Sequence, residues 1–120
     1  MPLRCLIVDD SLSFREAMRA LLEAQGIEIV GGAGSAAEAL AQIAELRPDV
    51  ALIDIDLGGE SGLALAQCVH DDAADAVPKV ILISTRDGSD FADLIEATPA
   101  VGFLSKTELS AATIRRMLAI

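Results

Sequence analysis

The regular alternation of short apolar runs with longer amphipathic stretches is the strongest constraint on how this chain folds. Five runs have the aliphatic and β-branched composition of strands: Leu3–Val8, Ile27–Val30, Val50–Ile55, Lys79–Ile83 and Val101–Leu104. A run such as VALIDI is apolar at nearly every position, as strands covered on both faces are. The pattern predicts an α/β fold in which five βα units form a doubly wound parallel sheet.

Five helices are expected between and after these runs. Their expected extents are Leu12 to Gln25, Ser35 to the residue before Pro48, Gly62 to about Asp72, Ser89 or Asp90 to the residue before Pro99, and Thr107 to the C-terminus. Several of these helices open on a residue that can cap a helix N-terminus, and Glu38 follows Ser35 at the spacing of a capping box. The two prolines set helix ends because the residue before a proline disfavours helical geometry.

Length and composition indicate one domain that spans residues 1–120. With 52% apolar residues, a chain of this size can bury a core without metal or disulfide staples. Nine Lys and Arg against 19 Asp and Glu give a net charge of −10, which argues against a surface that binds nucleic acid. Cys5 and Cys68 lack metal-ligand or redox spacing and are expected to be buried free thiols. No run is long enough for a membrane span or signal peptide, so a soluble cytoplasmic protein is expected.

Polar residues cluster where the expected strands end. These residues are Asp9 and Asp10, Asp54 and Asp56, Ser84 and Thr85, and Ser105 and Lys106. The carboxyl ends of parallel strands lie at one edge of a sheet, so these side chains are expected to converge. Carboxylates crowded at one edge repel each other unless a hard cation such as Mg²⁺ binds between them. A lysine and a hydroxyl beside that cation suit an anion, which indicates a phosphoryl-transfer site.

At these residues the chain resembles the receiver domain of bacterial two-component response regulators. The resemblance covers the whole chain and is carried by an acidic pair in LIVDD, an aspartate in DVALIDIDLGGESG, a hydroxyl in VILIST and a lysine in VGFLSK. It implies a flavodoxin-like fold whose five strands have the order 2-1-3-4-5. It also implies a signalling domain that catalyses its own phosphorylation and dephosphorylation and has no separate enzymatic activity.

The resemblance implies a role for each acidic residue of the site. Asp54 is the phosphoacceptor. Asp10, Asp54 and the backbone carbonyl of Asp56 are expected to bind Mg²⁺, or Mn²⁺ in its place, and Asp9 acts mainly through water. Asp56 is also expected to influence how long the phosphoryl group persists, together with Arg86, and we hypothesise that these two side chains pair over the site.

The resemblance further implies a switch and its partners. Lys106 and Ser84 contact the phosphoryl oxygens, and Ser84 with Phe103 forms the switch. The switch alters the face built by the fourth helix, fifth strand and fifth helix, through which a homodimer is also expected. The phosphoryl donor is a sensor histidine kinase or a phosphotransfer protein. His70, at the end of a helix, is expected on the surface without a phosphotransfer role.

Two positions depart from the family pattern. Gly58 stands where a proline is usual and is followed by Gly59, so the loop over the site is expected to be more flexible. Gly62, in contrast, matches the usual glycine. Thr107 replaces the proline that often follows the lysine and removes the cis bond found there.

Two alternatives to an active receiver are left open. IDIDLGG resembles the nucleophile motif of haloacid-dehalogenase-type phosphatases, in which Asp54 would be the nucleophile and Asp56 the general acid/base, although that family places the motif on its first strand. The other alternative is a degenerate receiver that acts as an interaction module independent of phosphorylation. The sequence also leaves open what the domain controls: the chain is either a stand-alone regulator or the receiver part of a longer transcription factor. The segment GFLSKTELSAATIRR resembles the receivers of regulators of the nitrate-response type, which favours the second.

Overall fold

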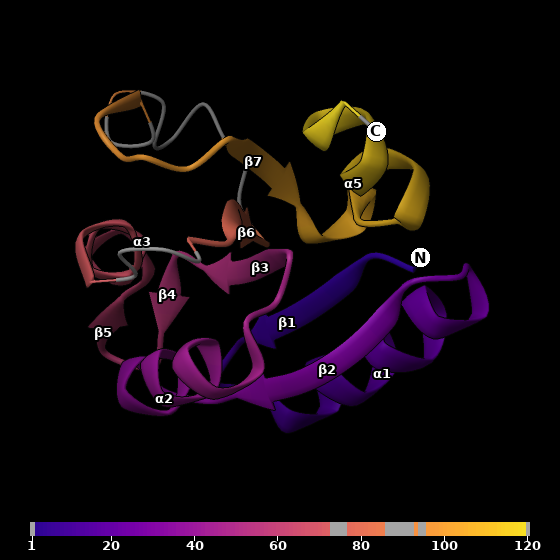
Figure 1. The fold of residues 1–120 in the computed structure, drawn as a ribbon, viewed down its shortest axis with the longest axis horizontal. Coiled ribbons are helices and arrows are strands. Elements are labelled where there is room, and N and C mark those ends of the chain that lie inside the picture. Colours follow the sequence, from indigo (N-terminus) through magenta and orange to yellow (C-terminus); the bar gives the residue numbers. More distant parts are fainter. Residues whose placement is uncertain (1, 73–76, 86–92, 94–95, 120) are drawn as a thin grey trace.

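A five-stranded parallel sheet forms the centre of the computed structural model, which describes residues 2–72, 77–85, 93 and 96–119. The strands are β1 (Arg4–Val8), β2 (Glu28–Ala33), β3 (Val50–Asp54), β6 (Lys79–Ser84) and β7 (Gly102–Ser105). Their order across the sheet is β2-β1-β3-β6-β7 (Figure 1), which confirms the predicted order 2-1-3-4-5. Two further short strands, β4 (Asp56–Leu57) and β5 (Glu60–Ser61), form a separate antiparallel hairpin.

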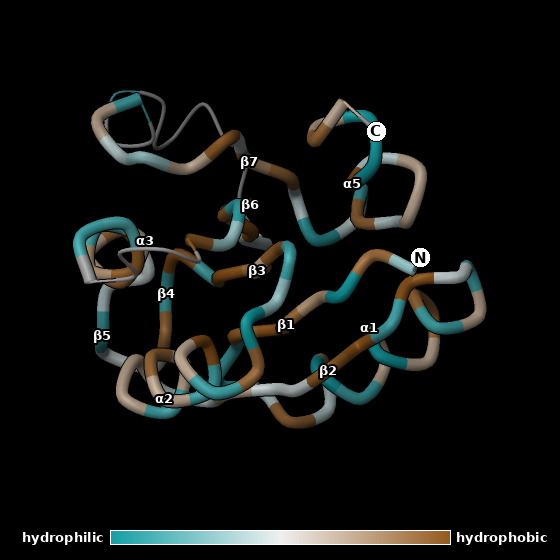
Figure 2. The backbone as a smooth tube through the Cα atoms, in the orientation of Figure 1, coloured by the Kyte–Doolittle hydropathy of each residue, from teal (hydrophilic) through white to brown (hydrophobic). Residues whose placement is uncertain are grey.

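Helices cover both faces of this sheet. They are α1 (Leu12–Ala24), α2 (Ala36–Leu46), α3 (Gly62–Asp72) and α5 (Ala111–Leu118). Alternate residues of β1 point to opposite faces: Leu6 and Val8 pack with α2 and α3, whereas Cys5 and Ile7 pack with α1 and α5. The strands are therefore apolar on both sides, as their hydropathy in Figure 2 shows. This arrangement leaves only the ends of the strands for polar side chains.

Helix α1 begins at Leu12 as predicted, and serine residues cap both α1 and α2, of which the sequence predicts the cap at Ser35. The Ser11 hydroxyl accepts a hydrogen bond from the backbone N–H of Phe14, and the Ser35 hydroxyl accepts one from the N–H of Glu38. Helix α2 ends at Leu46, one residue before Arg47 takes a left-handed conformation with φ of 48°. The expected fourth helix, which opens at Ser89 or Asp90, falls on residues outside the described part of the chain.

The last helix begins later than the sequence predicts. The expected start is Thr107, and the observed start is Ala111. Lys106–Glu108 instead forms one 3-10 turn, and α5 begins at Ala111 after the cap residue Ser110. The reason lies in Leu109, whose extended backbone places its side chain in the core with 4% exposure. A continuous helix from Thr107 would not leave Leu109 in that extended conformation.

Two other expectations need correction. Strand β2 continues to Ala33, three residues beyond the predicted end at Val30. At Gly31 a Cβ would lie 2.4 Å from Gln42 Oε1, so the missing side chain lets the end of the Gln42 side chain approach the strand closely. Cys68 is exposed on α3, whereas Cys5 is buried as expected; both are free thiols.

In the described residues we find no helix that is long and apolar enough to cross a membrane.

Gly62 is the glycine on which the approach of α3 to β3 depends. A Cβ at this position would lie 1.8 Å from the carbonyl oxygen of Asp54. We therefore expect Gly62→Ala to lower the free energy of unfolding by about 3 kcal/mol, measured by urea denaturation followed by circular dichroism. Gly59→Ala is the matched control, because it has open space around its Cβ and only a positive φ of 102° to strain it. Its expected cost is about 1 kcal/mol. Equal losses in the two variants would contradict the steric argument.

Candidate functional site

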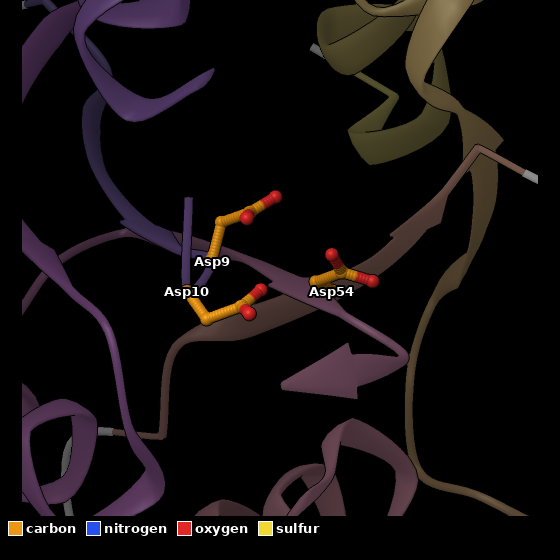
Figure 3. A group of neighbouring side chains, drawn as sticks. All are labelled: Asp9, Asp10 and Asp54. Atoms are coloured by element: carbon orange, nitrogen blue, oxygen red, sulfur yellow. The ribbon is translucent and has the colours of Figure 1, made fainter. Parts of the chain in front are cut away.

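The polar residues at the strand ends converge at one edge of the sheet. Asp9 and Asp10 follow β1, and Asp54 is the last residue of β3. Figure 3 shows the three side chains near one another, with Asp9 and Asp10 extending toward the side on which Asp54 lies. One carboxylate oxygen from each lies within 4.8 Å of the others, and the described residues contain no other cluster of three or more His, Cys, Asp or Glu that could hold a metal. The predicted convergence of these three residues is therefore present in the structure.

Lys106 lies between two of these carboxylates. Its Nζ is 2.5 Å from Asp9 Oδ2 and 2.9 Å from Asp54 Oδ2. The ammonium also lies 4.1 Å from the centre of the Phe14 ring, a distance that allows a cation–π interaction. The Lys106 side chain is largely buried, with 14% exposure. Two charges and one aromatic ring therefore define where this ammonium sits.

Phe14 is a contact of the site that the sequence analysis missed. Its position on the apolar face of α1 predicts only a core residue, and its side chain does pack with the core on that face of the sheet. One available signal was its place in the first turn of the helix that follows Asp10 directly. A side chain there lies close to the ends of the strands, because the helix starts at the same edge of the sheet.

Backbone N–H groups hold the two buried carboxylates in place. Asp9 is completely buried, and its Oδ1 accepts a hydrogen bond of 2.8 Å from the N–H of Ser11. Asp54 is 6% exposed, and its Oδ1 accepts one of 3.0 Å from the N–H of Asp56. Asp10, in contrast, is exposed to solvent. In each buried carboxylate, one oxygen thus accepts a backbone hydrogen bond and the other forms an ion pair with Lys106.

Burial and mutual contact shift the pKa values of both Asp54 and Lys106. Burial of Asp54 raises the pKa of its carboxyl, and the hydrogen bonds from the Asp56 N–H and from Lys106 oppose this only in part. Burial of Lys106 acts to lower the pKa of its ammonium, but the hydrogen bonds to Asp9 and Asp54 prevail and raise it. Lys106 is thus held in its charged form, beside an aspartate whose charge is destabilised by burial.

An open pocket of about 400 Å³ adjoins the carboxylates. It is lined by Asp10, Asp54, Ile55, Asp56, Gly58, Ser61, Ser84 and Thr85. Ser84, at the end of β6, is 6% exposed. The predicted acceptor, the exposed acid of the first strand and the predicted hydroxyl therefore share one cavity that is open to solvent.

The β4–β5 hairpin forms one wall of this pocket. Gly58 and Gly59 make its turn with φ values of 59° and 102°, and a Cβ on Gly58 would lie 2.9 Å from Asp10 Oδ2. Leu57 is 2% exposed in the core, and Glu60 Oε1 accepts a hydrogen bond of 3.1 Å from the N–H of Ala36. The two glycines, expected only to loosen this loop, thus form a paired turn that a proline could not adopt, because its φ is fixed near −65°.

The remaining predicted residues have separate positions. Phe103 is partly buried in β7 and packs against the core on the face that α2 and α3 cover. His70 is exposed at the end of α3, as predicted. Asp56 is exposed beside the pocket. Arg86 lies outside the described residues, and so does its hypothesised pairing with Asp56.

The chain is similar to known response regulators in sequence. The protein-glutamate methylesterase/protein-glutamine glutaminase 5 of Myxococcus xanthus (strain DK1622) is 39% identical over 85 residues, which cover 70% of this chain and 24% of that protein. The transcriptional regulatory protein LiaR of Bacillus subtilis (strain 168) is 31% identical over 110 residues, which cover 91% of this chain and 51% of that protein. The chain thus spans between about a quarter and a half of the length of these two relatives.

A solved structure and a family model indicate the same family as these relatives. The signal receiver domain of a Mycobacterium tuberculosis protein described as the response regulator NarL aligns with a TM-score of 0.81 at 31% identity, over 99% of this chain and 98% of that one. A family model described as the response regulator receiver domain matches residues 5–119. Switching by phosphorylation, binding of Mg²⁺ through acidic residues and interaction with histidine kinases are general to this family. The chain belongs to the family of response regulator receiver domains.

Proposed function

We propose that residues 1–120 form one active receiver domain, in which Asp54 accepts a phosphoryl group from the phosphohistidine of a histidine kinase or a phosphotransfer protein. One observation carries the proposal. Asp54 opens onto the pocket with one oxygen 2.9 Å from Lys106 Nζ, while Asp10 lines the same pocket. A receiver that had lost phosphorylation would not need this buried lysine against the acceptor.

The oxygen donors around Asp54 fit the divalent cation that the family binds. Asp10 and Asp54 offer carboxylate oxygens, and Asp56, which lines the same pocket, would offer its backbone carbonyl. Such hard donors suit Mg²⁺, and Mn²⁺ in its place. The Asp9 carboxylate is hydrogen-bonded to Lys106 and to the Ser11 N–H, so it would contact the cation mainly through a water molecule. The cation supplies neutralisation of charge on the transferring phosphoryl oxygens.

The chain's own residues can carry the transfer. An Asp54 oxygen forms the new P–O bond as the P–N bond of the phosphohistidine breaks, and the imidazole nitrogen leaves with the electron pair. Lys106 offers a positive charge to the equatorial oxygens, and the Ser84 hydroxyl offers a hydrogen-bond donor. Because the N–H of Asp56 fixes one Asp54 oxygen, the acceptor stays oriented during this step.

The switch and the output are further parts of the proposal. Ser84 pairs with Ser105 and Leu82 pairs with Phe103 in the β6–β7 register, so the strand that ends at the site hydroxyl lies next to the strand that carries the aromatic side chain. That strand belongs to the face through which a homodimer is proposed. Asp56 and Arg86 would set the phosphoryl lifetime. The similarity to LiaR and NarL supports a cytoplasmic transcriptional regulator of the nitrate-response type as the whole protein.

Phosphorylation of Asp54 is tested by intact mass. We expect incubation with acetyl phosphate and Mg²⁺ to add one phosphoryl group of about 80 Da, and Asp54→Asn to remove this gain completely. Chelation of Mg²⁺ should abolish it as well. Asp71→Asn, which changes an exposed carboxylate on α3, is the matched control and should be phosphorylated normally. A folded wild-type chain that binds Mg²⁺ and gains no mass would contradict the proposal and favour an interaction module independent of phosphorylation.

The buried acceptor predicts a pH-dependent stability in metal-free buffer. Because burial raises the pKa of Asp54 above its unfolded value, ionised Asp54 destabilises the fold at neutral pH, and this cost disappears once acid protonates the group. We expect Asp54→Asn to raise the stability by on the order of 1 kcal/mol at pH 7, or about 4 °C in Tm. The gain should shrink as the pH falls.

Thermal unfolding followed by circular dichroism across the pH range measures this effect. Asp71→Asn is again the control, because Asp71 lies at the surface of α3 away from the site, and it should leave the pH profile of the Tm unchanged. A Tm gain for Asp54→Asn that is equal at neutral and acid pH would show that the charge of Asp54 is not its source.

A further inference from the structure

Ser105 and Glu108 form a hydrogen-bonded box around the backbone of Lys106. We propose that this box positions Lys106 for phosphoryl transfer, with Ser105 and Glu108 as positioning residues that touch neither the phosphoryl group nor Asp54. The inference rests on the proposed function, because it assigns the device that places the lysine of that site.

A lysine side chain is flexible, so its ammonium is placed only if its backbone and its contacts are both fixed. The contacts of Lys106 are Asp9, Asp54 and the Phe14 ring. All three lie on other elements of the fold and therefore cannot hold the backbone of Lys106 itself. That backbone belongs to a 3-10 turn of three residues, Lys106–Glu108, which lies directly after the last residue of β7.

So short a turn has little stability of its own and needs fixed ends. The Ser105 hydroxyl accepts a hydrogen bond from the N–H of Thr107, and Glu108 Oε1 accepts one of 3.3 Å from the N–H of Ser105. The Ser105 and Thr107 hydroxyl oxygens also lie 2.9 Å apart. The side-chain bonds thus join both ends of the turn and enclose Lys106.

The box takes the place of a missing constraint. Thr107 occupies the position at which the family often has a proline, so the ring that would restrict the backbone next to the lysine is absent. Ser105 also pairs with Ser84 in the sheet, which ties the start of the turn to the strand that carries the site hydroxyl. The box is therefore anchored on the site side by the sheet and on the far side by buried Leu109.

The chain holds a second box that serves as a matched control. Five residues later, Ser110 and Thr113 cap α5 in the same way: the Ser110 hydroxyl accepts from the N–H of Thr113, and the Thr113 hydroxyl oxygen accepts from the N–H of Ser110. Ser110→Ala removes an equivalent cap from the neighbouring helix but leaves in place Thr113, whose hydroxyl also donates a hydrogen bond of 2.9 Å to the backbone carbonyl of Glu108 in the turn. A difference between Ser105→Ala and Ser110→Ala therefore separates positioning of Lys106 from general stability.

The first measurement is the rate of Asp54 phosphorylation by saturating acetyl phosphate and Mg²⁺, followed by intact mass. We expect Ser105→Ala to lower this rate about tenfold, and Ser110→Ala to leave it within about twofold of wild type. Mg²⁺ affinity should be unchanged in both variants. Ser105→Thr and Glu108→Gln keep the hydrogen-bond acceptors of the box, so both variants should be phosphorylated at close to the wild-type rate. Loss of activity in Ser105→Thr equal to that in Ser105→Ala would overturn the inference.

A second measurement does not depend on phosphorylation. The chain has two lysines, Lys106 and the exposed Lys79, so the rate of reductive methylation at each is readily followed by peptide mass spectrometry. Ser105→Ala should raise the reactivity of Lys106 relative to Lys79 by about threefold or more, whereas Ser110→Ala should not. An unchanged ratio in Ser105→Ala overturns the inference. A wild-type chain that takes up no phosphoryl group overturns the proposed function instead, and the methylation ratio still decides the role of the box.

Discussion

The ammonium of Lys106 is the interaction on which this edge of the protein depends. It lies within 2.9 Å of both Asp9 and Asp54, two carboxylates that are almost fully buried. Because both carboxylates share this one ammonium, removing Lys106 would leave two buried charges uncompensated, a loss that typically costs about 3–5 kcal/mol. One cation among three carboxylates still leaves a negative balance. The cluster is thus suited to attract a further cation while it keeps the acceptor oxygen of Asp54 facing the pocket.

The doubly covered sheet explains why the charges gather at this edge. Helices α1 and α5 cover one face and α2 and α3 the other, so the interior positions of the strands must be apolar. Polar groups can lie only where a strand ends, and parallel strands place those ends together. The hairpin then closes one side of the site, with Leu57 in the core and Glu60 on the first turn of α2. Gly58 suits this turn because its φ of 59° disfavours other residues and because a Cβ there would lie 2.9 Å from the Asp10 carboxylate.

Much of the fold and most of the site geometry follow from local sequence patterns. Strands that are apolar on both sides predict the covered sheet. The cluster of Asp9 and Asp54 is predictable because each residue lies at a strand end and parallel topology brings those ends together. Contacts between elements are harder to predict. The bond from Glu60 to α2 has no spacing signal, and the place of Phe14 in the first turn of its helix indicates a position near the site but not its contact with Lys106, since each contact joins residues that are distant in sequence.

The errors in helix boundaries have the same origin. Thr107 looks like a helix start, yet the burial of Leu109 divides the segment into a short turn and α5. Tertiary packing overrides the local preference here, and the two parts have separate serine caps, Ser105 before the turn and Ser110 before α5. That division also separates two tasks in the protein. The turn at 106–108 carries the lysine of the site, while α5 packs into the core through Ile114 and is joined to the turn by a hydrogen bond from the Thr113 hydroxyl to the Glu108 carbonyl.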